Sequence, residues 1–142
     1  MYPALLHIHS GLRWVVLLLI IINVLNALGG YTGNKTAGAG DKKLSLFALI
    51  CTHLQVLIGL GLYAISPKVQ FSASTMGNSM LRFFTMEHTV MMLIAVILVT
   101  IGHRVAKSGS FKKQFWYYLI ALIVILVAIP WPFRTALGTG WF

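Results

Sequence analysis

Few of the 142 residues are charged, and only two of them are acidic. Asp, Glu, Lys and Arg make up 9% of it, whereas a soluble domain carries roughly a quarter charged residues. The only acidic residues are Asp41 and Glu87, against 11 Lys and Arg, so the net charge is +9. The single cysteine, Cys51, excludes an intramolecular disulfide framework. With 58% hydrophobic residues, this composition predicts an integral membrane protein.

The excess of basic residues does not indicate a nucleic-acid partner. Most of these residues flank long apolar runs, where the positive-inside bias and contact with the lipid bilayer's headgroups account for them. The chain also lacks a Gly-rich phosphate loop, a pair of cysteines for zinc, and a nucleophile–base–acid set. We therefore expect no nucleic-acid binding and no independent catalytic activity.

Four apolar runs are long enough to cross a membrane, which takes about 20 residues. They cover residues 4–28, 44–65, 80–103 and 114–133. The first run lacks the basic start of a cleaved signal peptide and is longer than its usual apolar region. Short connections favour antiparallel neighbours, so we predict an all-α, up-down four-helix bundle forming one transmembrane domain over residues 1–142. Asp41 is placed to cap the second helix.

The distribution of basic residues predicts the orientation. The 29–43 connection holds three Lys and the 104–113 connection holds four Lys and Arg. The opposite side has the other four basic residues, Arg13, Lys68, Arg82 and Arg134. The positive-inside bias therefore places the two basic connections in the cytoplasm and both termini on the outer side.

Several ionisable side chains fall within or at the ends of the predicted spans. They are His7, His9, Arg13, His53, Glu87, His88 and His103. Such groups are costly inside a membrane and are by default candidates for a functional site. A rise of ~1.5 Å per residue places His9 about 8 Å, His88 about 12 Å and Arg13 about 13 Å below the outer edge. His53 comes out deeper, about 18 Å down, and His103 at the opposite surface.

The positions of these residues around each helix show which of them share a face. His9 and Arg13 are separated by four positions and share one face of the first span. His7 is rotated about 200° from His9 and faces elsewhere. His88, Met92, Ala95, Val99 and His103 form one stripe of the third span.

Neutral imidazoles on facing helices are the usual axial ligands of haem. We therefore predict a haem b site with His9, His53 and His88 as the candidate iron ligands. The preferred pair is His9 with His88, on diagonal helices, and His53 with His88 is second. Arg13 and Arg82 are the candidate partners of the haem propionates. On the second span, Gly59 and Gly61 permit close approach of a flat ligand.

Other interpretations remain open for the same residues. Arg13 and Glu87 can form a buried ion pair without any cofactor, and His7 and His103 can serve as hydrogen-bond partners between helices. Met86, Met91 and Met92 are most simply packing residues. The alternative functions are a cofactor-free subunit of a larger membrane assembly, and a metal or proton permease that uses the polar groups as a relay.

Four segments carry a family resemblance: "LLHIHSGLRWVVLLL", "THLQVLIGLGLY", "MEHTVMMLIAVILVTIGH" and "IPWPFR". Together they resemble a family of small four-helix bacterial membrane proteins described as cytochrome b-like. The chain is more loosely similar in plan to one half of haem A synthase. The resemblance implies a small multi-pass protein of the bacterial inner membrane, with His7 or His9, His53 and His88 as the histidines to carry over. From the histidines themselves we expect a b-type cytochrome that transfers single electrons, with quinone or redox subunits as its partners. The bundle is small, so a site shared within a homo-oligomer is open as well.

Overall fold

The computed structural model describes residues 1–141, and within them every regular element is helical. The long helices are α1 (Tyr2–Thr32), α2 (Ala39–Ile65), α4 (His88–Lys107) and α5 (Phe111–Ala128). A short α3 (Ser79–Arg82) and a π-helical turn (Phe83–Glu87) run directly into α4. Two 3₁₀ turns, Thr75–Gly77 and Thr135–Leu137, complete the set. Four helices, with Ser79–Lys107 taken as one, are long and apolar enough to cross a membrane, which indicates a multi-pass membrane protein.

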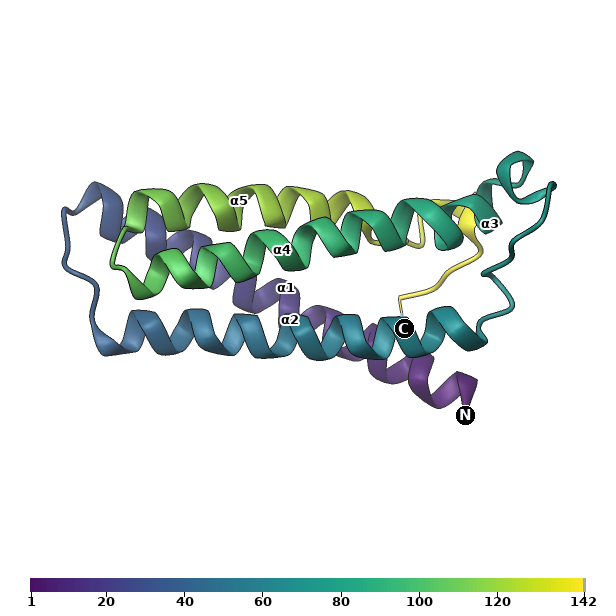
Figure 1. The fold of residues 1–142 in the computed structure, drawn as a ribbon, viewed down its shortest axis with the longest axis horizontal. Coiled ribbons are helices and arrows are strands. Elements are labelled where there is room, and N and C mark those ends of the chain that lie inside the picture. The colour runs from purple at the N-terminus through teal and green to yellow at the C-terminus, as the bar shows by residue number, and fades with distance from the viewer. Residues whose placement is uncertain (142) are drawn as a thin grey trace.

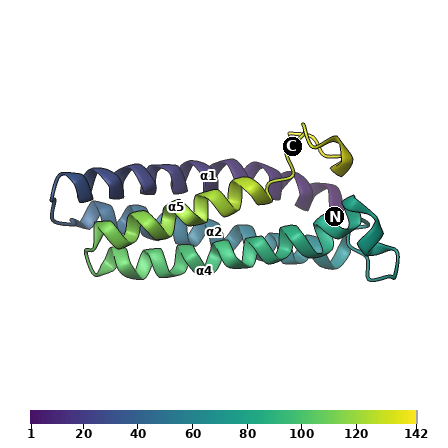
Figure 2. The ribbon, with the colours of Figure 1, turned by 90° about the horizontal axis from the view of Figure 1, so that it is seen from above.

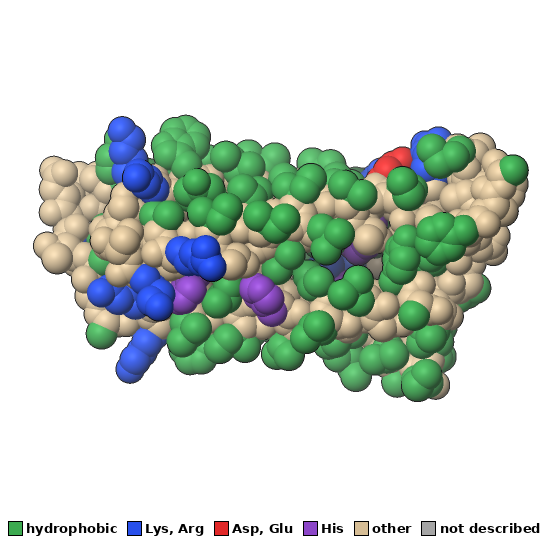
Figure 3. Space-filling view, viewed as in Figure 1, with side chains coloured by type: hydrophobic (Ala, Val, Ile, Leu, Met, Phe, Trp, Pro, Cys, Tyr) green, Lys and Arg blue, Asp and Glu red, His purple; other side chains and the backbone are tan. Residues whose placement is uncertain are grey.

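The long helices form the predicted bundle, each antiparallel to the next (Figures 1 and 2). In the ring of neighbours α1 packs on α2, α2 on α4, α4 on α5, and α5 on α1. Helices α1 and α4 are therefore diagonally opposite. Both described ends of the chain lie at the same end of the bundle as the connection between α2 and α3. Figure 3 shows Lys and Arg gathered toward the other end, and hydrophobic side chains along most of that face.

Several helix ends lie a few residues from the predicted limits: α2 begins at Ala39 instead of 44, α4 ends at Lys107 instead of 103, and α5 begins at Phe111 instead of 114. The far ends of α1 and α5 also differ, and a structural reason is visible for α5. Helix α1 continues to Thr32, through the glycines expected to begin a loop at residue 29. Gly30 lies there against the ring of Phe111, so close that an added Cβ would stand 2.5 Å from it. Helix α5 ends at Ala128 instead of 133, because Pro130 holds Ile129 in an extended conformation (φ −66°, ψ 129°).

The predicted cap of the second helix is confirmed. The backbone N–H of Gly38 donates to the Asp41 carboxylate at 2.7 Å. Asn26 of α1 donates to the other carboxylate oxygen at 2.9 Å. The cap therefore also ties α1 to the start of α2.

Buried polar side chains join the helices in the half of the bundle next to the basic end. The Gln114 amide donates to Asn23 at 3.4 Å, and the Tyr118 hydroxyl donates to the Ser45 carbonyl at 3.4 Å. The Ser45 hydroxyl lies 2.9 Å from His103 Nδ1. These contacts connect all four long helices, and His103 has the interhelical role considered from the sequence. These bonds tie the helices together in this half, and the cavity described below lies in the other half.

Candidate functional site

A cavity of about 370 Å³ lies in the half of the bundle that carries the termini. This volume falls within the usual range for small-molecule sites, about 300–1,000 Å³. All four long helices line it, together with residues 138–140 near the C-terminus. Its walls are mainly apolar. The imidazole, amide and cationic side chains that line it are His9, Arg13, Gln55, Lys68 and His88.

His9 and His88, from the diagonal helices α1 and α4, both line this cavity and lie next to each other there. Their ring centroids are 6.4 Å apart and the ring planes are inclined at 72°. Two imidazoles that bind one metal ion from opposite sides, with metal–nitrogen distances of about 2 Å, have ring centroids roughly 6 Å apart. The separation of the two histidines therefore suits ligation of a single metal centre between them.

The tautomer of His88 follows from its hydrogen bond. His88 Nδ1 lies 2.8 Å from the backbone oxygen of Ala128 in α5. A carbonyl oxygen only accepts, so Nδ1 carries the proton and Nε2 of the neutral ring keeps its lone pair. A backbone carbonyl on the outer nitrogen is the usual way to orient a metal-binding histidine.

The Ala128 carbonyl is available to His88 because of the sequence that follows α5. In a continuing helix it would accept from the N–H of residue 132, but that residue is Pro132 and has none. The two carbonyls before it accept from the Trp131 indole at 2.8 Å and from Arg134 at 3.3 Å. Side chains thus satisfy the end of α5, and one of them is a candidate ligand.

The chain reaches His88 through the π-helical turn Phe83–Glu87. Such turns occur often at functional sites because the extra residue changes which side chains face inward. The rings of Phe83 and Phe84 lie 5.8 and 6.2 Å from the His88 ring. His88 therefore sits between an aromatic pair on one side and the cavity on the other.

His9 is positioned by α2. The Gln55 side-chain amide donates to the His9 backbone carbonyl at 2.9 Å. Gly59 leaves room for the imidazole, because a Cβ there would stand 3.0 Å from its Cε1. Within residues 1–141, His9 Nδ1 and Gln55 Oε1 are buried without a hydrogen-bond partner. Buried polar atoms are rarely left without a hydrogen-bond partner. These two atoms could therefore form hydrogen bonds with a ligand in the cavity.

The structure does not bring the third predicted histidine to the cavity. His53 is exposed on the outside of α2, where its Nδ1 lies 2.8 Å from the Leu49 carbonyl of its own helix. Among residues 1–141, no three His, Cys, Asp or Glu side chains are grouped closely enough to hold a metal ion. His7 is also exposed, facing away from His9 as the helical wheel predicted. Of the histidines in residues 1–141, His9 and His88 are the two that line the cavity.

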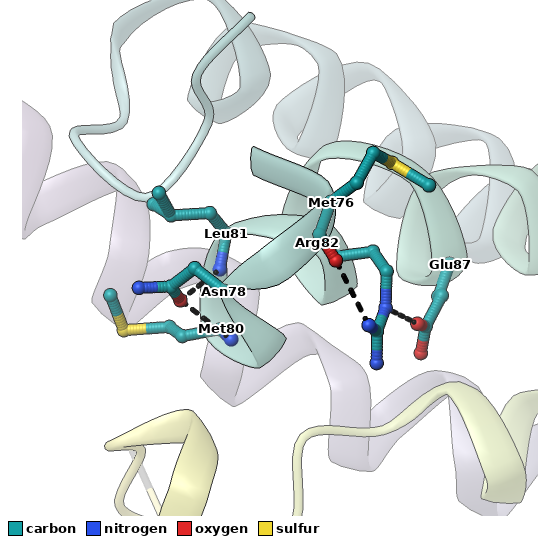
Figure 4. Close-up of polar contacts among 6 residues, drawn as sticks. All are labelled: Met76, Asn78, Met80, Leu81, Arg82 and Glu87. Atoms are coloured by element: carbon teal, nitrogen blue, oxygen red, sulfur yellow. Dashed lines mark hydrogen bonds and ion pairs between the residues drawn. The ribbon is translucent and has the colours of Figure 1, made fainter. Parts of the chain in front are cut away.

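Of the two arginines predicted to bind propionates, one lines the cavity and the other does not. Arg82 pairs with Glu87 at 2.8 Å, with 41% and 39% of the two side chains exposed, and donates to the Met76 carbonyl at 3.1 Å (Figure 4). It does not line the cavity. The ion pair considered between Arg13 and Glu87 is therefore replaced by a local and more exposed pair. Arg13 lines the cavity and donates to the Trp141 carbonyl at 2.5 Å.

Gln55 and Lys68 are the site residues that sequence reasoning missed. Gln55 is an amide inside an apolar helix, which is a detectable signal of the same kind as the histidines. Lys68 resembles any basic residue at a span boundary, and nothing in the sequence distinguishes it. Comparison of the chain with protein-family models, with curated proteins and with solved structures found no match.

Proposed function

We propose that this protein binds a b-type haem between His9 and His88 and carries single electrons, as a membrane subunit that exchanges them with quinone or with a redox partner. The observation that carries the proposal is the pair of imidazoles, with ring centroids 6.4 Å apart, that line a mainly apolar cavity from diagonal helices. When bound, the haem would supply one-electron chemistry, and the protein would supply its ligands and surroundings.

The chain's own residues have defined parts in this proposal. The Ala128 carbonyl holds the His88 proton on Nδ1, which leaves Nε2 as the ligand atom. Gln55 and Gly59 set the position of the His9 ring. Apolar residues from all four long helices form most of the cavity wall, and such surroundings lower the local dielectric and tune a bound redox group.

The basic end of the bundle supports a finer placement in the cell. We place the connections rich in Lys and Arg in the cytoplasm, both termini on the outer side, and the protein in the bacterial inner membrane. The haem would then lie in the outer half of the bilayer, because His9 and His88 line the cavity together with Tyr2 and residues 138–140, near the two termini.

The test is a reduced-minus-oxidised visible spectrum of the protein purified in mild detergent after expression with ample haem. We expect the Soret and α bands of a six-coordinate, bis-histidine haem. A colourless protein under these conditions would contradict haem binding and favour the cofactor-free subunit.

Separate alanine variants then identify the ligands. His9→Ala and His88→Ala should each abolish the six-coordinate spectrum, because each removes one axial nitrogen. His53→Ala and His7→Ala are matched controls on α2 and α1, and should leave the spectrum unchanged because both side chains face outward. Loss of the spectrum in His53→Ala would refute this assignment.

A further inference from the structure

The cavity carries positive charge without an acidic counterpart in its walls. Arg13 and Lys68 both line it, and none of the lining residues in the described chain is Asp or Glu. Cations in apolar surroundings are costly unless an anion or several hydrogen bonds compensate them. Arg13 Nε is itself buried without a hydrogen-bond partner within residues 1–141. The cavity is therefore electrostatically suited to an anionic ligand.

Both cations contact the same stretch of backbone. Arg13 donates to the Trp141 carbonyl at 2.5 Å, and the Lys68 ammonium donates to the Gly138 carbonyl at 3.1 Å. The stretch from residue 134 to 141, the C-terminal segment, turns back along the bundle after α5 (Figure 1), and its residues 138–140 line the cavity. The Trp141 ring stacks on Trp14 with centroids 6.3 Å apart. The two cations thus converge on one wall of the cavity.

In these contacts a cation meets a neutral carbonyl oxygen. A carboxylate would add the attraction of an opposite full charge and, for Arg13, a bidentate geometry that one carbonyl cannot provide. A ligand carboxylate that reaches this wall would therefore compete effectively with the Trp141 and Gly138 carbonyls. The apolar remainder of the cavity would hold the ligand's body.

We infer that Arg13 and Lys68 form a carboxylate-binding pair that orients the ligand of this cavity. The inference rests on the proposed haem site: the carboxylates are the two propionates, and the propionate edge of the macrocycle faces the C-terminal segment. Lys68 takes the place that the sequence suggested for Arg82. Arg82 is excluded from this role by its position outside the cavity, paired with Glu87.

The test compares ferric haem with haem dimethyl ester, in which both propionates lose their charge. Each is titrated into haem-free wild-type protein in detergent, and into Lys68→Gln, Arg13→Gln and Arg82→Gln. We expect the wild type to bind the free acid at least about tenfold more tightly than the ester, given the strength of charge-assisted hydrogen bonds. Lys68→Gln and Arg13→Gln should each reduce this preference severalfold while ester binding stays constant.

The outcomes separate this inference from the haem proposal. If Lys68→Gln and Arg13→Gln keep the wild-type preference, or if Arg82→Gln alone removes it, the carboxylate pair is refuted and the haem site stands. If the wild type binds neither compound, both are refuted. Lys68→Arg and Arg13→Lys keep the charge and should keep the preference, which separates loss of charge from faulty folding. Circular dichroism and gel filtration check the fold of every variant.

Discussion

At the scale of single residues, Gly59 and Gly61 have different surroundings, although only one residue separates them in α2. A Cβ on Gly59 would lie 3.0 Å from the His9 ring, whereas a Cβ on Gly61 would meet nothing within 4 Å. Alanine favours a helix over glycine by roughly 0.5–1 kcal/mol. Both Gly59→Ala and Gly61→Ala should therefore leave the helix at least as stable as before.

Only the first substitution should affect the site. Gly59→Ala has to displace the His9 imidazole by a few tenths of an ångström, and we expect a loss of haem affinity of roughly tenfold, as for other changes that disturb ligand orientation. Gly61→Ala should bind haem as the wild type does. Equal haem affinity in the two variants, measured by titration, would contradict the position assigned to His9.

At the scale of elements, the end of α5 orients the His88 ring, because the Ala128 carbonyl accepts a hydrogen bond from it. Pro130→Ala with Pro132→Ala should let α5 continue and provide an N–H at residue 132 for the Ala128 carbonyl. His88 Nδ1 would then lose its acceptor, and haem affinity should fall roughly tenfold, as is typical when the outer partner of a ligand histidine is removed.

Trp131→Phe is the matched control for that prediction. It removes a donor to another carbonyl of the same helix end and keeps an aromatic ring in place, so haem binding should not change. If both variants weaken binding alike, the effect comes from the helix end as a whole and not from the His88 hydrogen bond.

The same elements show what the sequence could predict. Long apolar runs identified the four helices, because the pattern needs no knowledge of neighbours. The predicted C-terminal ends of α1 and α5 were wrong. Helix α1 continues through Gly30, which packs against Phe111, a residue distant in the sequence. Helix α5 ends early because of the two prolines that follow it.

The site was predictable in part for a similar reason. Depth and helical phase grouped His9, Arg13 and His88, and all three line the same cavity in the structure. Depth alone could not show that His53 faces outward, since that depends on how α2 is rotated against its neighbours. Nor could it separate Arg13 from Arg82, because the Arg82–Glu87 pair forms across the π-helical turn.

At the scale of the whole molecule, the proposed orientation predicts which connections are accessible from outside the cell. Ala73 is exposed in the connection between α2 and α3, and Lys35 is exposed in the connection between α1 and α2. Each can be replaced singly by cysteine, as Ala73→Cys and Lys35→Cys, in a protein that also carries Cys51→Ser. A membrane-impermeant maleimide added to intact cells should label Ala73→Cys and leave Lys35→Cys unlabelled, because the basic end faces the cytoplasm. The opposite labelling pattern would invert the orientation, while permeabilised cells should label both.

The C-terminal segment also sets an order of assembly. Residues 138–140 form part of the cavity wall, yet they follow all four helices along the chain. During synthesis, His9 and His88 are therefore made before this part of the wall. We expect a ligand that binds before the segment has packed to meet no barrier from these residues. A ligand that arrives later has to break the contacts that Arg13 and Lys68 make with the segment.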